Sequence, residues 1–183
     1  MNLLETSLPG AWVIDSKSLQ DNRGAFSRIF CALELQEILG SRTIVQINHS
    51  ITRDVGSIRG LHYQKTPHAE LKIIRCLKGR VFDVAVDLRQ GSPTFLKWNA
   101  VELTPRSNLA YVIPEGCAHG FQVLEANSEL LYLHTAFYTP TSEVAVRFDD
   151  PRISVNWPLT PTNVSVKDKS HPLLNEGFEG VII

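Results

Sequence analysis

Three features are scarce in this chain of 183 residues: cysteine, an excess of charge of one sign, and long apolar runs. The three cysteines are Cys31, Cys76 and Cys117, and neither their odd number nor their spacing fits a disulfide framework or a metal site. They therefore predict free thiols in a reducing compartment, and we expect a cytoplasmic protein.

The charge balance excludes a strong overall field. Lys and Arg together number 18 against 19 Asp and Glu, a formal net charge of −1. We expect no nucleic-acid partner and no membrane partner, so any anion must be recognised by locally placed cations. No apolar run is long enough to span a bilayer, and the first residues lack the basic and then apolar pattern of a signal sequence.

Long helical periodicity is also missing, whereas short β-type runs separated by turn residues fill most of the chain. The length fits a single domain, residues 1–183. The pattern predicts an all-β fold, a sandwich or jelly-roll β-barrel with one or few short helices. One helix is expected over 32–39, ended by Gly40, and the tail from Asp149 reads as irregular. The expected strands are 11–15, 26–31, 43–48, 71–77, 81–88, 94–103, 109–113, 120–124, 129–137 and 144–148.

Period-two alternation places several polar side chains on otherwise apolar strand faces. These side chains are Lys72, Asp83, Tyr132 and His134. On any single strand, such a residue could equally reach solvent at a sheet edge. Their recurrence on several strands predicts a pocket lined by polar groups inside the barrel.

The segment Arg59-Gly60-Leu61-His62-Tyr63-Gln64, followed by Lys72, places a histidine between two cations. Taken singly, a surface arginine, a core histidine and a lysine whose stem packs on apolar surface are common. Together they suit a base that removes a proton from a substrate with an anionic end.

A metal site is the first alternative to weigh. The segment from Pro114 to His119 has the pattern Pro-x-Gly-x-x-His, the second half of the cupin metal motif, whose first half needs two histidines one residue apart. Here His62 is followed by Gln64, and neither His68 nor His134 has the spacing to supply the missing ligand. We expect no catalytic metal. A metal-dependent cupin oxygenase or isomerase, with iron or zinc at His62 and His119, is the alternative.

Segments that match one known family occur in that family's order from about residue 10 to 175. They are Asp21 to Phe26, Gln46 to Ser50, Arg59 to Gln64, Val81 to Arg89, Ser92 to Phe95, Ile113 to Gly116, Ala118 to Phe121, Asp149 to Pro151, Trp157-Pro158 and Ser165 to Asp168. On these segments the chain resembles the dTDP-4-dehydrorhamnose 3,5-epimerase family, a metal-independent branch of the cupins.

The resemblance implies a cofactor-independent isomerase of dTDP-linked deoxysugar biosynthesis, which supplies rhamnose for cell-surface polysaccharide. The family removes and returns protons at carbons 3 and 5 of a dTDP-linked 4-keto-6-deoxy sugar, whose ketone lets the carbanion become an enolate. By resemblance His62 is the base, Asp168 orients it, Tyr132 is the acid on the opposite face, and Lys72 stabilises the enolate. Apart from the resemblance, a tyrosine with one hydrogen-bond partner and a solvated tail aspartate would be the ordinary interpretations of two of these residues.

The resemblance also implies contacts to the nucleotide sugar. Tyr138 would stack on the base, which does not by itself distinguish one pyrimidine from another, and arginines would bind the diphosphate with paired hydrogen bonds. Arg28 stands where the family has a glutamate substrate contact, and we count it among the expected contacts. The others are Arg23, Gln46, Asn48, Arg59, His119, Glu143 and Lys167.

Four positions depart from the family pattern: Arg28 replaces a glutamate, Leu133 a lysine, Ala136 an aspartate and Cys117 an aromatic residue. None of them removes a predicted catalytic group, so the reaction type is better determined than the substrate. An epimerase of one centre or a ketoisomerase remains an alternative. A non-catalytic sugar-nucleotide binder is another, supported only by Arg28 and Leu133.

Finally, the resemblance implies a homodimer. A jelly roll has sheet edges that need covering. In the family, N-terminal strands are exchanged between subunits, so residues near Arg23 and Phe26 are expected to reach the pocket of the partner.

Overall fold

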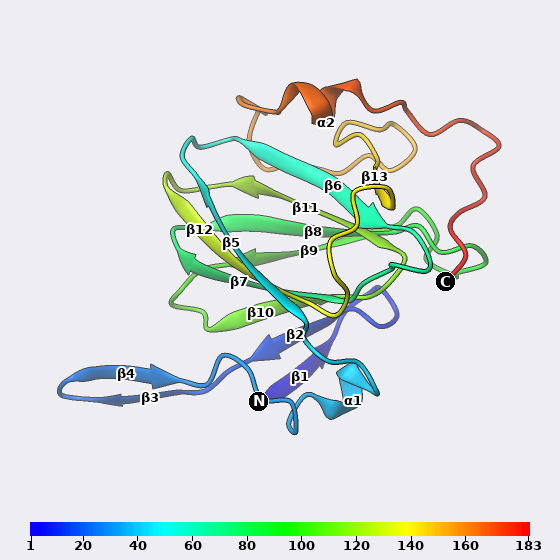
Figure 1. The fold of residues 1–183 in the computed structure, drawn as a ribbon. Coiled ribbons are helices and arrows are strands. Elements are labelled where there is room, and N and C mark those ends of the chain that lie inside the picture. The colour runs from blue at the N-terminus through cyan, green and yellow to red at the C-terminus, as the bar shows by residue number, and fades with distance from the viewer.

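Two antiparallel sheets face each other in the computed structural model, which describes residues 1–183 (Figure 1). The six-stranded sheet has the order β1 (Asn2–Glu5), β2 (Trp12–Asp15), β10 (Leu109–Ile113), β7 (Lys72–Lys78), β12 (Ser128–His134) and β5 (Gln46–Thr52). The five-stranded sheet has the order β13 (Glu143–Ala145), β6 (Ile58–Gln64), β11 (Cys117–Val123), β8 (Val81–Asp87) and β9 (Trp98–Leu103). Most neighbours are not consecutive in sequence, and the predicted all-β jelly roll of cupin type is confirmed.

Apolar side chains form three clusters, one between the two sheets and one on the outer face of each sheet. Side chains alternate between the two faces of a strand, so each strand can contribute to two of these layers. The cluster between the sheets includes Tyr111, Phe121 and Leu130, and Cys117 also lies there. Burying each large side chain of this kind contributes about 1.5 to 3 kcal/mol. These side chains fill one part of the space between the two sheets, and the other part forms a cavity.

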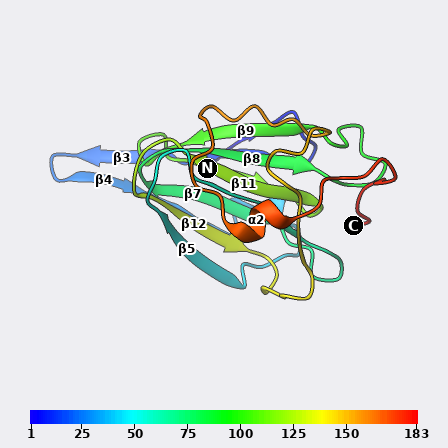
Figure 2. The same ribbon diagram turned by 90° about the horizontal axis from the view of Figure 1, so that it is seen from above.

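The outer face of each sheet is also covered. Helix α1 (Gln36–Leu39) and the turns before it lay Leu35, Ile38 and Leu39 on the six-stranded sheet, where Leu133 packs as well. The C-terminal tail covers the five-stranded sheet with Trp157 and other apolar side chains, so the irregular tail wraps the barrel. Helix α2 (Val166–Ser170) crosses beside β6 within this tail (Figures 1 and 2).

A hairpin of β3 (Ser18–Asp21) and β4 (Gly24–Ser27) projects away from the barrel (Figures 1 and 2). Asp21 stabilises its turn because a carboxylate oxygen accepts a 2.8 Å hydrogen bond from the Arg23 backbone N–H. Leu19 and Phe26 are 70% and 71% exposed on this hairpin. Apolar surface of this size on a projecting element is unusual in an isolated subunit.

Several predicted boundaries are wrong. The predicted strand 26–31 ends at Ser27, because Arg28 then pairs with Glu34 and Phe30 packs against the cluster around α1. The predicted helix 32–39 is helical only over Gln36–Leu39, although Gly40 does take the positive φ of 58° expected of a helix terminus. The predicted strand ranges include none that corresponds to β1, β3 or β6, and helix α2 was not predicted.

None of the helices is long and apolar enough to cross a membrane.

Candidate active site

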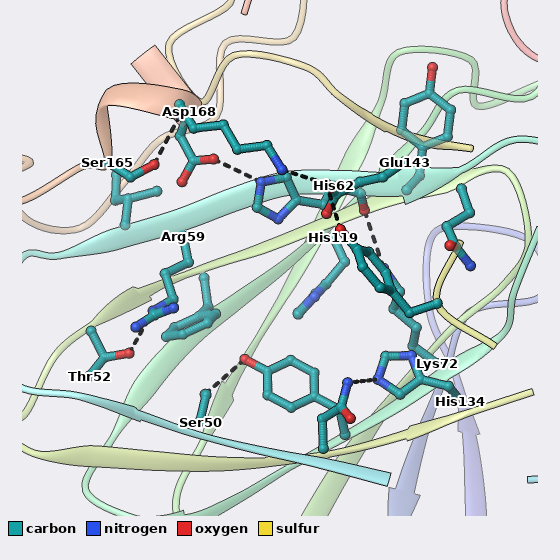
Figure 3. Close-up of a pocket in the computed structure, with 18 of the residues that line it drawn as sticks. Ser50, Thr52, Arg59, His62, Lys72, His119, His134, Glu143, Ser165 and Asp168 are labelled. Carbon is teal, nitrogen blue, oxygen red and sulfur yellow. Dashed lines mark hydrogen bonds and ion pairs between the residues drawn. The ribbon is translucent and has the colours of Figure 1, made fainter. Parts of the chain in front are cut away.

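A cavity of about 550 Å³ opens between the two sheets. Strand β6 and helix α2 contribute one side of it, with His62 and Asp168, and strands β5, β7 and β12 contribute the other side, with Ser50, Lys72 and His134 (Figure 3). The predicted pocket with polar residues in its lining therefore exists, and it draws its groups from segments far apart in sequence.

Two glycines let β6 and β11 approach closely beneath the cavity. A Cβ atom on Gly60, whose φ is +117°, would lie 2.6 Å from the Cα of Gly120 and from the carbonyl oxygen of His119. A Cβ on Gly120 would lie 2.6 Å from the carbonyl oxygen of Arg59. Only glycine fits such spacing, and this close approach fixes the backbone on both sides of Arg59 and His62.

His62 and Asp168 form a hydrogen-bonded pair with 2.8 Å between Nε2 and Oδ1 (Figure 3). Helix α2 presents the carboxylate because Ser165 caps it, its Oγ accepting a 3.0 Å hydrogen bond from the Asp168 backbone N–H. Burial alone would raise the pKa of Asp168, but the hydrogen bond and charge of His62 outweigh it and lower that pKa. The ionised carboxylate fixes the orientation of the imidazole.

Tyr132 lies on the opposite sheet. Its hydroxyl is 3.1 Å from Ser50 Oγ, and its ring lies between the imidazoles of His119 and His134, with centroids 6.0 Å and 6.1 Å away. Burial raises the pKa of Tyr132, so the phenol keeps its proton at neutral pH. A partly buried, protonated phenol can act as a proton donor.

The ammonium of Lys72 is nearly buried, with the residue 8% exposed. It lies 3.1 Å from Glu70 Oε1 and donates a 3.4 Å hydrogen bond to the backbone carbonyl of His62. Lys72 therefore holds its ammonium next to the backbone of β6 at His62, within the same cavity. A charge held in a site shielded from water interacts more strongly than one at the surface.

A second imidazole and carboxylate pair lies deeper. His119 Nε2 is 3.0 Å and 3.1 Å from the two oxygens of Asp83, which is fully buried. Burial raises the pKa of Asp83. His119 is the cross-strand neighbour of His62, so this pair supports the wall that carries the first pair.

At the mouth of the cavity, Glu143 hydrogen-bonds the ammonium of Lys167 and accepts a 3.3 Å hydrogen bond from the Tyr138 hydroxyl. Arg59 Nε donates to Thr52 Oγ1 at 3.0 Å (Figure 3). Burial would raise the pKa of Glu143, but the hydrogen bonds from Lys167 and Tyr138 together with the charges of His62 and Lys167 outweigh it and lower that pKa. Two cations and an aromatic ring thus lie around one opening.

The structure brings ten of the predicted site residues together in this cavity. They are Asn48, Arg59, His62, Lys72, His119, Tyr132, Tyr138, Glu143, Lys167 and Asp168.

Three predicted contacts do not line the cavity within one chain. Arg23 lies at the tip of the projecting hairpin and pairs with Asp21, and Arg28 pairs with Glu34. Gln46 lies at the start of β5 on the same face as Asn48, where its amide nitrogen donates to Asn48 Oδ1 and its amide oxygen accepts from the backbone N–H of Tyr138. The roles of these three residues as substrate contacts stay predictions. For Arg23 the predicted pocket is that of a partner subunit, and the hairpin that carries it projects away from the barrel.

Sequence reasoning missed several residues of the site. Ser50, Glu70 and Ser165 line the cavity without having been singled out. Glu70 lies two residues before the start of β7, outside the predicted strand 71–77, so strand alternation could not place it beside Lys72. Ser165 is followed three residues later by Asp168, a spacing that signals a helix start.

The set of side chains that could bind a metal ion is not that of the cupin motif. The donor atoms of His62, Asp168 and His171 all lie within 4.8 Å of one another, and His119 is not among them. His68 is exposed and does not line the cavity. The metal-dependent alternative requires His62 and His119 to bind the same ion. His119 does not lie in the group of possible ligands around His62.

Fold and site together define a cupin-type jelly roll with an imidazole, a phenol and an ammonium around one cavity. The model of the dTDP-4-dehydrorhamnose 3,5-epimerase family matches residues 5–176. The chain belongs to this family, as the sequence motifs predict.

Individual relatives agree over nearly full length. The dTDP-4-dehydrorhamnose 3,5-epimerase of Salmonella typhimurium is 38% identical over 180 residues, covering 97% of this chain and 98% of that protein. The 3,5-epimerase of Legionella pneumophila, solved with dTDP-4-keto-L-rhamnose, superposes with a TM-score of 0.89 at 39% identity, covering 94% of this chain and 92% of that one. A 3′-monoepimerase of Streptomyces bikiniensis, solved with dTDP-quinovose, superposes with a TM-score of 0.86 at 29% identity. This match covers 93% of this chain and 86% of that one.

Proposed function

We propose that this protein is a dTDP-4-dehydrorhamnose 3,5-epimerase, an isomerase that inverts carbons 3 and 5 of dTDP-4-dehydro-6-deoxy-glucose without a cofactor. One observation carries the proposal: His62 with its carboxylate and Tyr132 line the same cavity from opposite sheets, and Lys72 lies beside His62. Membership of the family and the near full-length relatives support it.

In the proposed reaction His62 removes the proton from the carbon next to the ketone. The imidazolium that forms is stabilised by the Asp168 carboxylate at 2.8 Å. The electron pair moves onto the ketone oxygen, and the ammonium of Lys72 stabilises the enolate. Tyr132 then delivers a proton to the other face of the flat enolate, which inverts the centre.

The nucleotide end of the substrate lies at the mouth of the cavity in this proposal. Arg59 and Lys167 bind the diphosphate, Tyr138 stacks on the thymine, and Asn48, His119 and Glu143 contact the remaining polar groups, arrangements that suit a planar base and an anionic linker. Glu143 keeps Lys167 at the opening by its hydrogen bond.

The working protein is a homodimer in this proposal. Exposed apolar side chains on the hairpin, Leu19 and Phe26, and on the edge strand β5, Ile47 and Ile51, support a covering partner. In the dimer Arg23 serves the pocket of the partner subunit rather than its own. Sedimentation velocity tests this: we expect a dimer for the wild type and a monomer for Phe26→Asp.

The whole chain is taken as one domain, as predicted from its length. The three free thiols support a cytoplasmic location.

Proton NMR in deuterium oxide tests the function. With dTDP-4-dehydro-6-deoxy-glucose as substrate, we expect the signals at carbons 3 and 5 to disappear as solvent deuterium replaces both protons. Loss at carbon 3 alone would indicate a mono-epimerase, and no loss at either carbon would contradict any epimerase. Metal analysis of the same protein sample separates the cupin alternative, which requires stoichiometric iron or zinc.

A further inference from the structure

A chain of directed hydrogen bonds runs along the wall of the cavity behind the proposed reacting groups. It begins at the backbone N–H of Tyr138, which donates to Gln46 Oε1 at 3.0 Å. Because a backbone N–H can only donate, this bond fixes which end of the Gln46 amide is oxygen. The amide nitrogen of Gln46 then donates to Asn48 Oδ1 at 3.2 Å.

The orientation of Asn48 fixes the next step. Its Nδ2 points at His134 Nε2 from 3.3 Å, so that ring nitrogen must accept. The ring proton of His134 is therefore on Nδ1, which lies 2.7 Å from Glu70 Oε2. Each bond in this series determines the direction of the next.

The chain ends at the lysine of the proposed mechanism. The second oxygen of Glu70 lies 3.1 Å from Lys72 Nζ, and the same ammonium reaches the backbone carbonyl of His62 at 3.4 Å. The carboxylate of Glu70 is nearly buried, with its side chain 7% exposed. Burial alone would raise the pKa of Glu70, but the hydrogen bond from His134 and the charge of Lys72 outweigh it and lower that pKa.

We propose that Glu70 and His134 are positioning residues for Lys72. This inference deepens the proposed function and rests on it, because it concerns the lysine that stabilises the enolate. Glu70 holds the ammonium beside the base, and His134, with its proton on Nδ1, holds the carboxylate of Glu70 in the orientation that leaves one oxygen for the lysine.

The arrangement has a physical advantage over a free lysine. A Lys side chain has several rotatable bonds, and fixing it in one orientation costs rotamer entropy. Here that orientation is set before substrate arrives, by two hydrogen-bond acceptors, Glu70 and the carbonyl of His62. Groups placed before the reaction need no rearrangement as charge develops.

The cross-strand register explains why these residues meet. His134 on β12 pairs directly with Lys72 on β7, and with Gln46 on the edge strand β5. Glu70 lies two residues before Lys72. The ring of His134 also stacks on the phenol ring of Tyr132, with centroids 6.1 Å apart and planes 11° apart. The unit therefore touches both the lysine and the proposed acid.

The chain provides a matched control. Glu129 on β12 also bonds one histidine and one lysine, with 3.0 Å to His49 Nε2 and 3.5 Å to Lys78 Nζ. Glu129 does not line the cavity, and Lys78 is largely exposed. Glu129→Gln therefore removes the same kind of charge from the same kind of partners at a carboxylate outside the cavity, and of those partners only His49 is a lining residue.

The first readout is the tautomer of His134, which is independent of activity. Long-range proton–nitrogen NMR of the ¹⁵N-labelled full chain at neutral pH, with His134→Gln used to assign the signal, should show the proton on Nδ1. In Glu70→Gln that preference should weaken, because the amide is a poorer acceptor than the carboxylate. A wild-type proton on Nε2 would overturn the inference.

The second readout is the rate of deuterium uptake by dTDP-4-dehydro-6-deoxy-glucose. We expect Glu70→Gln and His134→Gln each to lower kcat about tenfold or more with KM within about threefold, and Glu129→Gln to stay within about twofold of the wild type. The double variant should be little worse than the poorer single one, because the two residues act through one unit. Thermal midpoints are measured for the wild type and all four variants.

The two levels of the account fail differently. A wild-type protein that exchanges neither proton would overturn the proposed function, and the positioning role with it. Two other results, in a wild-type protein that exchanges normally, would overturn the positioning role alone. One is a Glu70→Gln variant as active as Glu129→Gln. The other is a double variant in which the effects of Glu70→Gln and His134→Gln add independently. A folded Glu70→Gln with the expected loss of kcat supports it.

Discussion

Replacing Asp168 by asparagine tests how the proposed base is supported. The carboxylate has a side chain only 6% exposed and an oxygen 2.8 Å from His62 Nε2. Asparagine keeps the shape and one acceptor but removes the charge that stabilises the imidazolium. A hydrogen bond to a charged group contributes about 1.5 to 3 kcal/mol, and about 1.4 kcal/mol corresponds to a factor of ten in rate.

We therefore expect Asp168→Asn to lower kcat by roughly 10- to 150-fold while KM changes little. If the carboxylate were only a solvated surface charge, its pairing would contribute less than about 1 kcal/mol and the loss would be under about fivefold. The two cases are far enough apart to distinguish.

The assay is the initial rate of deuterium incorporation at carbon 3, followed by NMR over a range of substrate concentrations. Glu176→Gln, which changes an exposed carboxylate of the same tail, serves as the control and should match the wild type. A rate for Asp168→Asn within about threefold of the wild type, in a protein that is folded, would refute the reasoning about the buried pair.

Three further predictions concern charge and backbone. Lys72→Met should lower kcat by about a hundredfold or more in steady-state assays with a smaller change in KM, because the enolate loses its cation; an unchanged kcat would contradict this role. Asp87 has its pKa lowered from 3.8 to about 2 because bonds from Arg89, Ser92 and Thr94 outweigh burial. It therefore stabilises the fold above about pH 4 and loses that contribution as pH falls toward 2, so Asp87→Asn should lower the free energy of unfolding in urea by about 2 kcal/mol at pH 7 and by much less near pH 2. Gly60→Ala should lower that free energy by about 2 kcal/mol or more and reduce activity, whereas Gly177→Ala, where a Cβ has 3.5 Å to its nearest neighbour, should be nearly neutral; equal stabilities would contradict the close approach of β6 and β11.

Much of the sheet could be predicted from the sequence because strand alternation is a local property. The prediction for 109–113 coincides with β10, and the common face of Tyr132 and His134 was predicted from period two alone. The tip of the hairpin also has local causes, since Asp21 and Gly24, which flank the turn at 22–23, are residue types that favour turns.

The predictions that were wrong or missing concern elements whose structure depends on contacts with other segments. Phe30 leaves the strand pattern because it packs on the cluster around α1, which no local rule reveals. Helix α2 has a single turn and forms where its cap at Ser165 and the pair of Asp168 with His62 hold it. Short helices of this kind have little intrinsic stability.

The sequence predicted many of the residues that line the cavity, but not the hydrogen bonds and ion pairs between them. The family resemblance named His62, Tyr132, Lys72 and Asp168, whose catalytic roles stay predictions. The contact from Glu70 to Lys72 needs coordinates, because a glutamate near a lysine in sequence is most often a solvated pair. Leu133 departs from the family pattern, yet it packs on the outer face of the six-stranded sheet rather than in the cavity.

The central claim is that a base and an acid act on opposite faces of one enolate. The most direct test compares His62→Asn and Tyr132→Phe with the substrate in deuterium oxide, following exchange and the configuration of the product together. The account predicts that His62→Asn abolishes exchange, whereas Tyr132→Phe still exchanges the proton but returns deuterium to the original face and gives little inverted sugar. Normal inversion by Tyr132→Phe, or undiminished exchange by His62→Asn, would contradict it.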